Sequence, residues 1–133
     1  MRKGALPSRL RSYFEGGIIV TKGVDRCLFA FPPEEWATFK ANIKANADLS
    51  ARGRQLSRMF FSMAFEATLD RHGRVLILTN LARYAGLRRD VTVTGVDDRL
   101  EIWDTEEWDR YVSGADDLFS EIVEEFAGRE LGG

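Results

Sequence analysis

Short runs in which hydrophobic and polar residues alternate recur along the chain, a pattern typical of half-buried β-strands. Residues 90–94 alternate and are rich in β-branched side chains, and residues 100–103 follow a turn at Asp97-Asp98, so these two runs predict a β-hairpin. The runs at 18–21 and 28–31 predict an equivalent hairpin nearer the amino terminus. The pattern therefore indicates a protein with β-hairpins at its centre.

Two more strands are predicted between these hairpins. Residues 61–69 alternate large apolar side chains with small or polar ones, and residues 74–78 form a short apolar run. The second run is followed by a short helical segment at 79–85. The segment 48–60 has apolar residues at helix-compatible spacing with arginines between them, which predicts a helix that connects the two hairpin regions.

Each hairpin is followed by a signal for the start of a helix. Pro32-Pro33 supplies positions that need no partner for an amide hydrogen, and Asp104 with Glu107 three residues later resembles a capping box. Near the carboxyl end, residues 117–129 carry an apolar residue at every fourth position among glutamates. This spacing predicts an acidic amphipathic helix that covers its own unit or a neighbouring one.

The chain also matches itself. Residues 23–36 and residues 95–108 share the pattern G-V-D-x-x-L-x-x-[FW]-x-x-E-E-W without a gap. Upstream the match continues with one extra residue in the second copy, which aligns Lys3 with Arg74. Such a repeat predicts two similar structural units. We divide the chain into a first unit at 1–47, a connector helix at 48–60, a second unit at 61–112, and an acidic carboxyl-terminal helix and tail at 113–133.

The composition fits a folded cytoplasmic protein. Hydrophobic residues make up 44% of the 133 residues, which is enough apolar surface to offset the entropy of ordering the chain. The apolar runs are far shorter than the ~20 residues that span a bilayer, and the amino terminus lacks the apolar region of a signal peptide. The single Cys27 and the single His72 provide neither an intrachain disulfide nor a zinc site. We expect no metal, no cofactor, no membrane, no small-molecule substrate and no enzymatic activity.

Charge is segregated along the chain, although the net charge is only −2. Residues 1–58 carry 11 basic and 5 acidic side chains, a net charge of +6, whereas residues 59–133 carry 8 basic and 16 acidic side chains, a net charge of −8. Binding to nucleic acid requires clustered lysine and arginine to neutralise phosphates. The asymmetry therefore suggests a basic surface held apart from an acidic tail, although solvated helix faces alone can produce it.

Residues 69–77, L-D-R-H-G-R-V-L-I, with Leu81 and residues 84–87, Y-A-G-L, resemble the signature D-x-x-G-R-V-x-I-P-x-x-L-R-x-Y-A-G-L of the MraZ family. With the duplicated G-V-D-x-x-L pattern and the Glu-Glu-Trp helix starts, the resemblance covers nearly the whole chain. It implies a β-rich α+β fold of two tandem SpoVT-AbrB-like swapped-hairpin units that form a pseudo-twofold barrel, with connector and carboxyl-terminal helices. It also implies a nucleoid-associated, ring-shaped homo-oligomer. This ring would bind direct repeats in the promoter of the cell-division and cell-wall gene cluster and regulate its transcription, with repression as the expected direction.

The segment after residue 69 has the chemistry of an exposed cationic loop between two strands. Asp70 can accept turn amide hydrogens, and Gly73 permits a backbone conformation with positive φ. Arg71 and Arg74 would then lie at the tip, where a guanidinium can contact phosphate or the O6 and N7 atoms of guanine. Alternatively, Arg74 pairs with Asp70 in an ordinary charged turn. The expected DNA-binding residues are Asp70, Arg71, Gly73 and Arg74, with Lys3 at the equivalent position of the first unit and Arg2, Arg9 and Arg11 adding non-specific attraction to phosphate.

The sequence departs from the family pattern at several positions. The strand and aspartate that open the family's first unit are missing before Lys3, and a sheet edge would be left unpaired. Leu78 and Ala82 stand where the family has proline and arginine. These departures motivate an alternative function, a diverged AbrB-like oligomer that has lost DNA recognition and acts through protein contacts. An enzyme that uses Asp70 and His72 as an acid-base pair is a third possibility, which rests only on their proximity in sequence.

Overall fold

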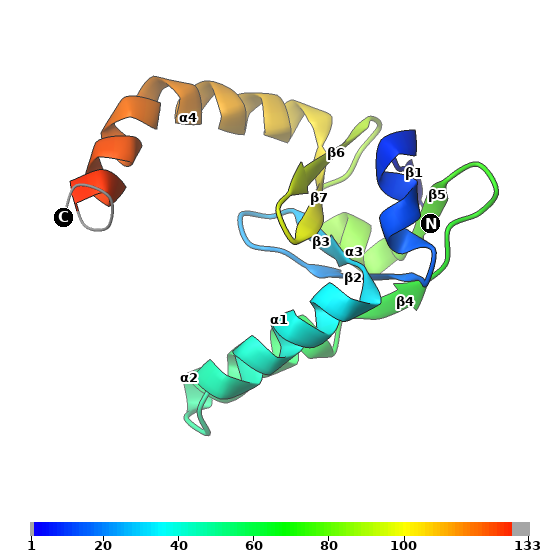
Figure 1. The fold of residues 1–133 in the computed structure, drawn as a ribbon, viewed down its shortest axis with the longest axis horizontal. Helices are drawn as coiled ribbons and strands as arrows, with labels where there is room; N and C mark the ends of the chain where they lie inside the picture. The colour runs from blue at the N-terminus through cyan, green and yellow to red at the C-terminus, as the bar shows by residue number, and fades with distance from the viewer. Residues whose placement is uncertain (1, 129–133) are drawn as a thin grey trace.

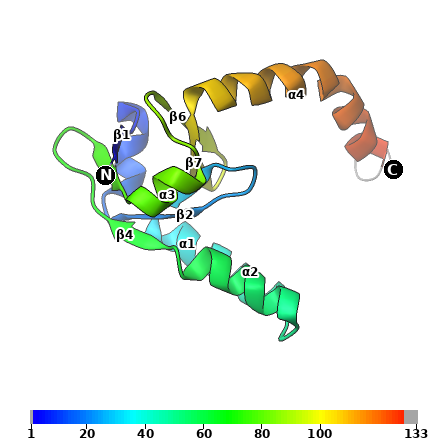
Figure 2. The same ribbon diagram turned by 180° about the vertical axis from the view of Figure 1, so that it is seen from behind.

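The computed structural model describes residues 2–128, with only the backbone described for residues 2–4 (Figures 1 and 2). The elements in chain order are β1 (Arg2–Ala5), the 3-10 helix η1 (Ser8–Phe14), β2 (Ile18–Lys22), β3 (Leu28–Phe31), α1 (Pro33–Asn46), α2 (Ala51–Phe61), β4 (Phe65–Ala67), β5 (Arg74–Ile77), α3 (Thr79–Tyr84), β6 (Val91–Val96), β7 (Arg99–Asp104) and α4 (Thr105–Phe126). Both predicted hairpins and the predicted connector helix are present. The strand predicted over 61–69 is shorter, because α2 continues to Phe61.

Five strands form an antiparallel sheet in the order β4-β2-β3-β7-β6, and β1 pairs with β5 in a separate two-stranded sheet (Figure 1). The fold is mixed α+β. The prediction that the fold is β-rich is wrong, because the helices together contain more residues than the strands. The long helices α1 and α4 account for this difference. The five-stranded sheet is open, with β4 at one edge and β6 at the other, so the described residues do not close a barrel.

Strand pairing places equivalent residues of the two sequence repeats opposite each other. In the β3–β7 pair Phe29 lies opposite Glu101, which is its own counterpart in the second copy of the repeat. In the β1–β5 pair Gly4 lies opposite Val75, which is again its counterpart. An antiparallel pair centred on equivalent residues is the arrangement that a twofold relation between two similar units produces.

The two hairpins differ in their turns, although the sequence match runs through both without a gap. The first hairpin closes with the amide of Gly23 donating to the carbonyl of Cys27 at 2.7 Å, which leaves a turn of three residues, 24–26. The second closes where Val96 lies opposite Arg99, which leaves a turn of two residues, 97 and 98. If the ungapped sequence match is extended into these strands, it therefore aligns β2 with β6 one residue out of step with the alignment that strand pairing gives. As a result Ile19 and Thr92 are equivalent, because they face the equivalent residues Phe31 and Trp103.

Two apolar clusters hold these elements together. The larger one gathers side chains from both sheets, η1 and α3, including the fully buried Ile18, Leu28, Ile77 and Leu81. The smaller one is mainly aromatic and attaches α1, α2 and the start of α4 to the sheet. Its members are Cys27, Phe29, Phe31 and Trp103, with Trp36, Phe39, Phe60 and Trp108 packed against them. Since these helices are anchored near one end only, α1 and α2 form an arm that extends from the body (Figure 2).

Helix α4 runs without a break from Thr105 to Phe126. The helix start predicted at Asp104 and the amphipathic helix predicted over 117–129 therefore belong to a single element. It begins beside β7 and then extends away from the sheet, in a direction different from that of the α1–α2 arm (Figures 1 and 2). Across residues 2–128, every helix is too short or too polar to cross a bilayer.

Candidate nucleic-acid interface

One carboxylate organises the turn between β4 and β5. Asp70 Oδ1 accepts hydrogen bonds from the backbone amides of His72 at 2.8 Å and Arg74 at 3.0 Å, and its Oδ2 accepts one from Arg74 Nε at 3.0 Å. The amide of Asp70 in turn donates to the carbonyl of Arg74 at 2.9 Å. The prediction that Asp70 accepts turn amide hydrogens is confirmed. We call residues 70–74 the cationic loop.

Gly73 lies where the cationic loop meets η1. Its φ is 73°, in the left-handed region that side chains disfavour. A β-carbon at this position would lie 2.0 Å from Nε of Arg11, whose guanidinium packs against the loop. The same Nε donates to the carbonyl of Leu6 at 3.2 Å. Arg11, which the sequence assigns to general attraction of phosphate, therefore supports the shape of the loop.

The two arginines of the cationic loop remain accessible. Arg71 is exposed, and the side chain of Arg74 is 43% exposed. Arg74 uses only Nε in its contact with Asp70, and its terminal amino groups form no hydrogen bond or ion pair with residues 5–128. The ion pair foreseen as an alternative to DNA contact is thus present, but it leaves the end of the guanidinium free. The pair fixes the direction in which Arg74 points.

Two cations of the first repeat, Arg2 and Lys3, lie on β1, which pairs with β5 at the end of the cationic loop. Ala5 faces Arg74 and Lys3 faces Leu76, so the backbone positions of Lys3 and Arg74 belong to neighbouring strands of one small sheet. The side chains of Arg2 and Lys3 lie outside the described residues. Arg9 is exposed on η1, the short helix that follows this strand.

The loop offers little support for acid-base or nucleophilic chemistry. Asp70 meets His72 through the backbone amide of His72 rather than through its imidazole. Burial, followed by the nearby charge of Glu101, raises the pKa of the Cys27 thiol to about 12, so this side chain stays protonated. Within the described part of the chain, no group of three or more histidine, cysteine, aspartate or glutamate side chains is placed to hold a metal ion.

The hydrogen bonds of the cationic loop make its order dependent on pH. The backbone amide of Arg74, followed by that of His72 and by the Arg74 guanidinium, lowers the pKa of Asp70 to about 2. Because the folded pKa lies below its usual value of 3.8, the ionised carboxylate stabilises the loop above about pH 4, and this contribution is lost as the pH falls towards 2. We expect the NMR amide signals of His72 and Arg74 to shift with a midpoint near pH 2. The Asp70→Asn variant should show no such step, and a wild-type midpoint near 3.8 would contradict the loop geometry.

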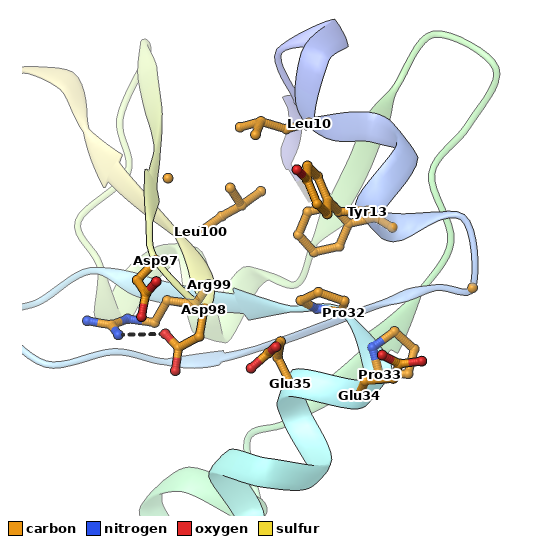
Figure 3. Close-up of a pocket in the computed structure, with 13 residues that line it drawn as sticks. Leu10, Tyr13, Pro32, Pro33, Glu34, Glu35, Asp97, Asp98, Arg99 and Leu100 are labelled. Atoms are coloured by element: carbon orange, nitrogen blue, oxygen red, sulfur yellow. Dashed lines mark hydrogen bonds and ion pairs between the residues drawn. The ribbon is translucent and has the colours of Figure 1, made fainter.

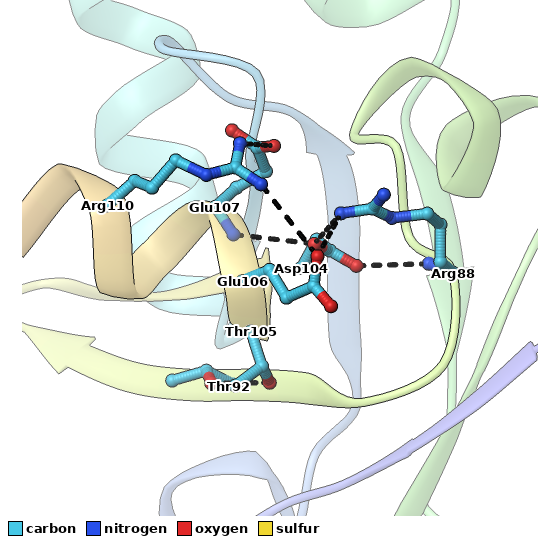
Figure 4. Close-up of polar contacts among 7 residues, drawn as sticks. All are labelled: Arg88, Thr92, Asp104, Thr105, Glu106, Glu107 and Arg110. Carbon is cyan, nitrogen blue, oxygen red and sulfur yellow. Dashed lines mark hydrogen bonds and ion pairs between the residues drawn. The ribbon is translucent and has the colours of Figure 1, made fainter.

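A second charged group fastens the start of α4 (Figure 4). The buried carboxylate of Asp104 accepts hydrogen bonds from the backbone amide of Arg88 at 3.1 Å, from Arg88 Nη2 at 3.2 Å and from the amide of Glu107 at 3.4 Å. Burial opposes ionisation of Asp104, but the hydrogen bonds from Arg88 outweigh it and keep the pKa of this carboxyl below its usual value. The sequence identified Asp104 as a helix cap, but it missed Arg88, which lies 16 residues away.

The fold and the cationic loop together define a class of protein. This is a small α+β protein built on an internal repeat, with an ordered cationic turn between two strands. The family model described as "MraZ protein, putative antitoxin-like" matches residues 5–57 and 60–130. The chain belongs to the MraZ family.

Three relatives with similar sequence identity to this chain support this assignment. A protein from Desulforamulus reducens is 43% identical over 124 residues, covering 92% of this chain and 87% of the relative. One from Thermobifida fusca is 42% identical over 120 residues, covering 90% of this chain and 84% of the relative. One from Frankia alni is 39% identical over 120 residues, with the same coverage of 90% and 84%. All three are named transcriptional regulator MraZ, so the resemblance inferred from residues 69–87 is confirmed.

Proposed function

We propose that this protein is a sequence-specific DNA-binding transcriptional regulator that acts as a ring-shaped homo-oligomer on direct repeats in a promoter. The observation that carries the proposal is the cationic loop, in which Asp70 holds Arg74 by Nε while the Arg74 side chain stays 43% exposed. The names of the relatives support the regulatory role. From the family resemblance we infer repression of the cell-division and cell-wall gene cluster and a place in the cytoplasm, on the nucleoid.

In this proposal the residues in and beside the loop have different roles in DNA recognition. The terminal amino groups of Arg74 form a fork that matches O6 and N7 of guanine, the commonest specific contact in the major groove. Arg71 and Arg9 supply charge toward phosphates, as does Lys3 on the strand beside the loop. We further propose that the two repeats form tandem AbrB-like swapped-hairpin units, with Asp70 and Gly73 shaping the loop of the second unit.

Complementary helices support assembly into a ring. Helix α4 is acidic and exposes large apolar side chains, which include Leu118, Phe119, Ile122 and Val123. The α1–α2 arm exposes Leu56 and Met59 between basic side chains, which are Arg52, Arg54 and Arg58. Opposite charges around apolar residues fit α4 of one copy packing on the arm of the next copy. A head-to-tail contact of this kind closes into a ring when the rotation between copies allows it.

Assembly is what makes the loop contacts sufficient for binding. A single small module makes few DNA contacts and binds weakly. Several loops held at fixed spacing convert later contacts into intramolecular ones, which raises affinity by about 10²–10⁴ without any new type of contact. The proposal therefore requires both the loop and the oligomer.

Binding should depend on the number of repeats and on the exposed face of α4. We expect the protein to bind DNA with three direct repeats at least about 100-fold more tightly than DNA with one repeat. The Ile122→Lys variant places a charge on the exposed apolar face of α4, so it should dissociate the oligomer and lower the affinity for both DNAs to a similar weak value. Gel retardation at several salt concentrations and analytical ultracentrifugation measure the two effects.

The matched control is Ser120→Lys, which adds the same single charge at an exposed polar position of the same helix. It should preserve the oligomer better than Ile122→Lys does. An intact oligomer that retains no repeat DNA even at low salt would contradict the proposal and support action through protein contacts. Equal affinity for one and three repeats would show that the loops do not act together.

A further inference from the structure

A contact between the two repeats holds the base of the cationic loop. Arg11 belongs to η1 in the first repeat, whereas the loop belongs to the second repeat. The Arg11 guanidinium packs so closely against Gly73 that a β-carbon there would lie 2.0 Å from Nε and 2.4 Å from Cζ. This approach is possible because glycine carries no side chain. The guanidinium therefore occupies the space that a side chain at residue 73 would fill.

Main-chain hydrogen bonds tie this contact to the buried core. The amide of Leu6 donates to the carbonyl of Gly73 at 2.9 Å, and the carbonyl of Leu6 accepts from Nε of Arg11 at 3.2 Å. Leu6 is buried, so both of its backbone groups are held in place by the core. Arg74 follows Gly73 directly and lies opposite Ala5 in the pair of β1 and β5. Leu6, Gly73 and Arg11 thus form a closed link beside the backbone of Arg74.

Helix η1 is itself anchored, which fixes the position of Arg11. Leu10 and Tyr13 point toward Leu100 and the β6–β7 hairpin (Figure 3), and Leu10 packs against the main core. Phe14, on the same helix, is buried. The side chain of Arg11 turns instead toward the cationic loop, where it meets Gly73. Because the core holds η1, Arg11 contacts the loop from a fixed base.

The contact depends on geometry rather than on charge. Among residues 5–128, no ion pair joins Arg11 to a carboxylate. The repeat aligns Arg11 with Ala82 of α3, which is buried. The equivalent helix therefore folds with a small side chain at this position. This comparison indicates that Arg11 serves the loop and not the helix that carries it.

We propose that Arg11 is a positioning residue for DNA recognition, which sets the direction of Arg74 through Gly73 and so determines sequence preference. The inference rests on the proposed function, because it requires Arg74 to contact a base. A recognition group must be held to about 0.5 Å by the residues behind it. Asp70 restrains the side chain of Arg74 at Nε, and Arg11 restrains the backbone that precedes it. This role differs from the general attraction of phosphate expected from the sequence.

Two substitutions in the full-length protein separate the geometry of Arg11 from its charge. In Arg11→Gln the side-chain amide nitrogen lies as many bonds from the α-carbon as Nε does, so it still donates to Leu6 without a charge. In Arg11→Lys the charge remains, but a methylene stands at that place. We expect Arg11→Gln to keep the preference for repeat over scrambled DNA within about twofold, and Arg11→Lys to lose about tenfold of it. Fluorescence anisotropy measures both preferences.

Salt dependence gives an independent readout, with Arg71→Gln as the matched control. Arg71 is an exposed cation of the same loop and is proposed to contact phosphate. Its loss should lower the slope of log affinity against log salt by about 1 or more and leave the preference unchanged. Arg11→Lys should lose the preference and keep the slope. If instead Arg11→Lys keeps the preference and Arg11→Gln lowers the slope as Arg71→Gln does, Arg11 contacts phosphate and the proposal is wrong.

Hydrogen exchange without DNA shows whether Arg11 acts through the loop. The amides of His72 and Arg74 should exchange about tenfold faster in Arg11→Lys than in the wild type, with the midpoint of thermal unfolding unchanged. A lost preference with unchanged exchange would mean that Arg11 touches DNA itself, which overturns the proposal. If Arg74→Ala loses the preference and Arg11→Lys does not, the proposed function stands and this inference fails. A wild type without any preference for repeat DNA would contradict both.

Discussion

Replacing Arg74 with alanine is expected to lower the affinity for repeat-containing promoter DNA by about 100-fold or more. Each guanidinium that forks onto a guanine contributes about 1–3 kcal/mol of discrimination, and the oligomer loses one such contact at every engaged loop. The oligomer should persist, because Arg74 is 43% exposed and the cationic loop is distant from α4 and the α1–α2 arm (Figure 1). Thermal unfolding should change little, since exposed ion pairs contribute little to stability. Fluorescence anisotropy with repeat and scrambled DNA measures the effect.

Two further variants separate charge from geometry. Arg74→Lys keeps the positive charge but removes the fork, so we expect it to retain most of the salt-dependent binding and to lose most of the preference for the repeat over scrambled DNA. Arg83→Ala removes an exposed cation on α3, outside the loop and outside the proposed contact between copies, and should leave that preference unchanged. Wild-type affinity and specificity in Arg74→Ala, with the oligomer intact, would exclude the loop as the reading element.

The Asp104→Ala variant should lose roughly 2–3 kcal/mol of the free energy of unfolding, from a helix cap worth about 1 kcal/mol and hydrogen bonds to a charged group worth about 1.5 kcal/mol. Its carboxylate is 3% exposed and receives three hydrogen bonds, so water replaces those partners poorly. The amides of Arg88 and Glu107 would lose their acceptor. Urea denaturation measures the loss, and we expect the midpoint of thermal unfolding to fall by roughly 5–10 °C.

Asp104→Asn is the matched control, because an asparagine oxygen still caps the helix while the charge is removed. It should lose less stability than Asp104→Ala does. Arg88→Ala should also cost less, since the Arg88 side chain is 58% exposed and water solvates it already. If Asp104→Ala unfolds like the wild type, the carboxylate does not hold α4 to the segment that follows α3.

The sequence by itself determined the local features of this protein. Both hairpins, the connector helix and the turn at residues 70–74 were predicted, because their main contacts join residues close together in the chain. The contacts of Asp70 with His72 and Arg74 span only two and four residues, so residue types and spacing are enough to specify them. The repeat and the family were visible for a related reason, since both are properties of residue order alone.

Only the tertiary structure decided how these pieces meet. The contact of Arg11 with Gly73 and the bond between Arg88 and Asp104 join elements whose approach depends on the whole fold. The length of α4 was also missed, because helix ends depend on tertiary packing as well as on local propensity. The place of β6 at one edge of the five-stranded sheet is the clearest case. Local alternation specifies that residues 91–96 form a strand, but only the order of strands in the sheet shows which neighbours that strand has.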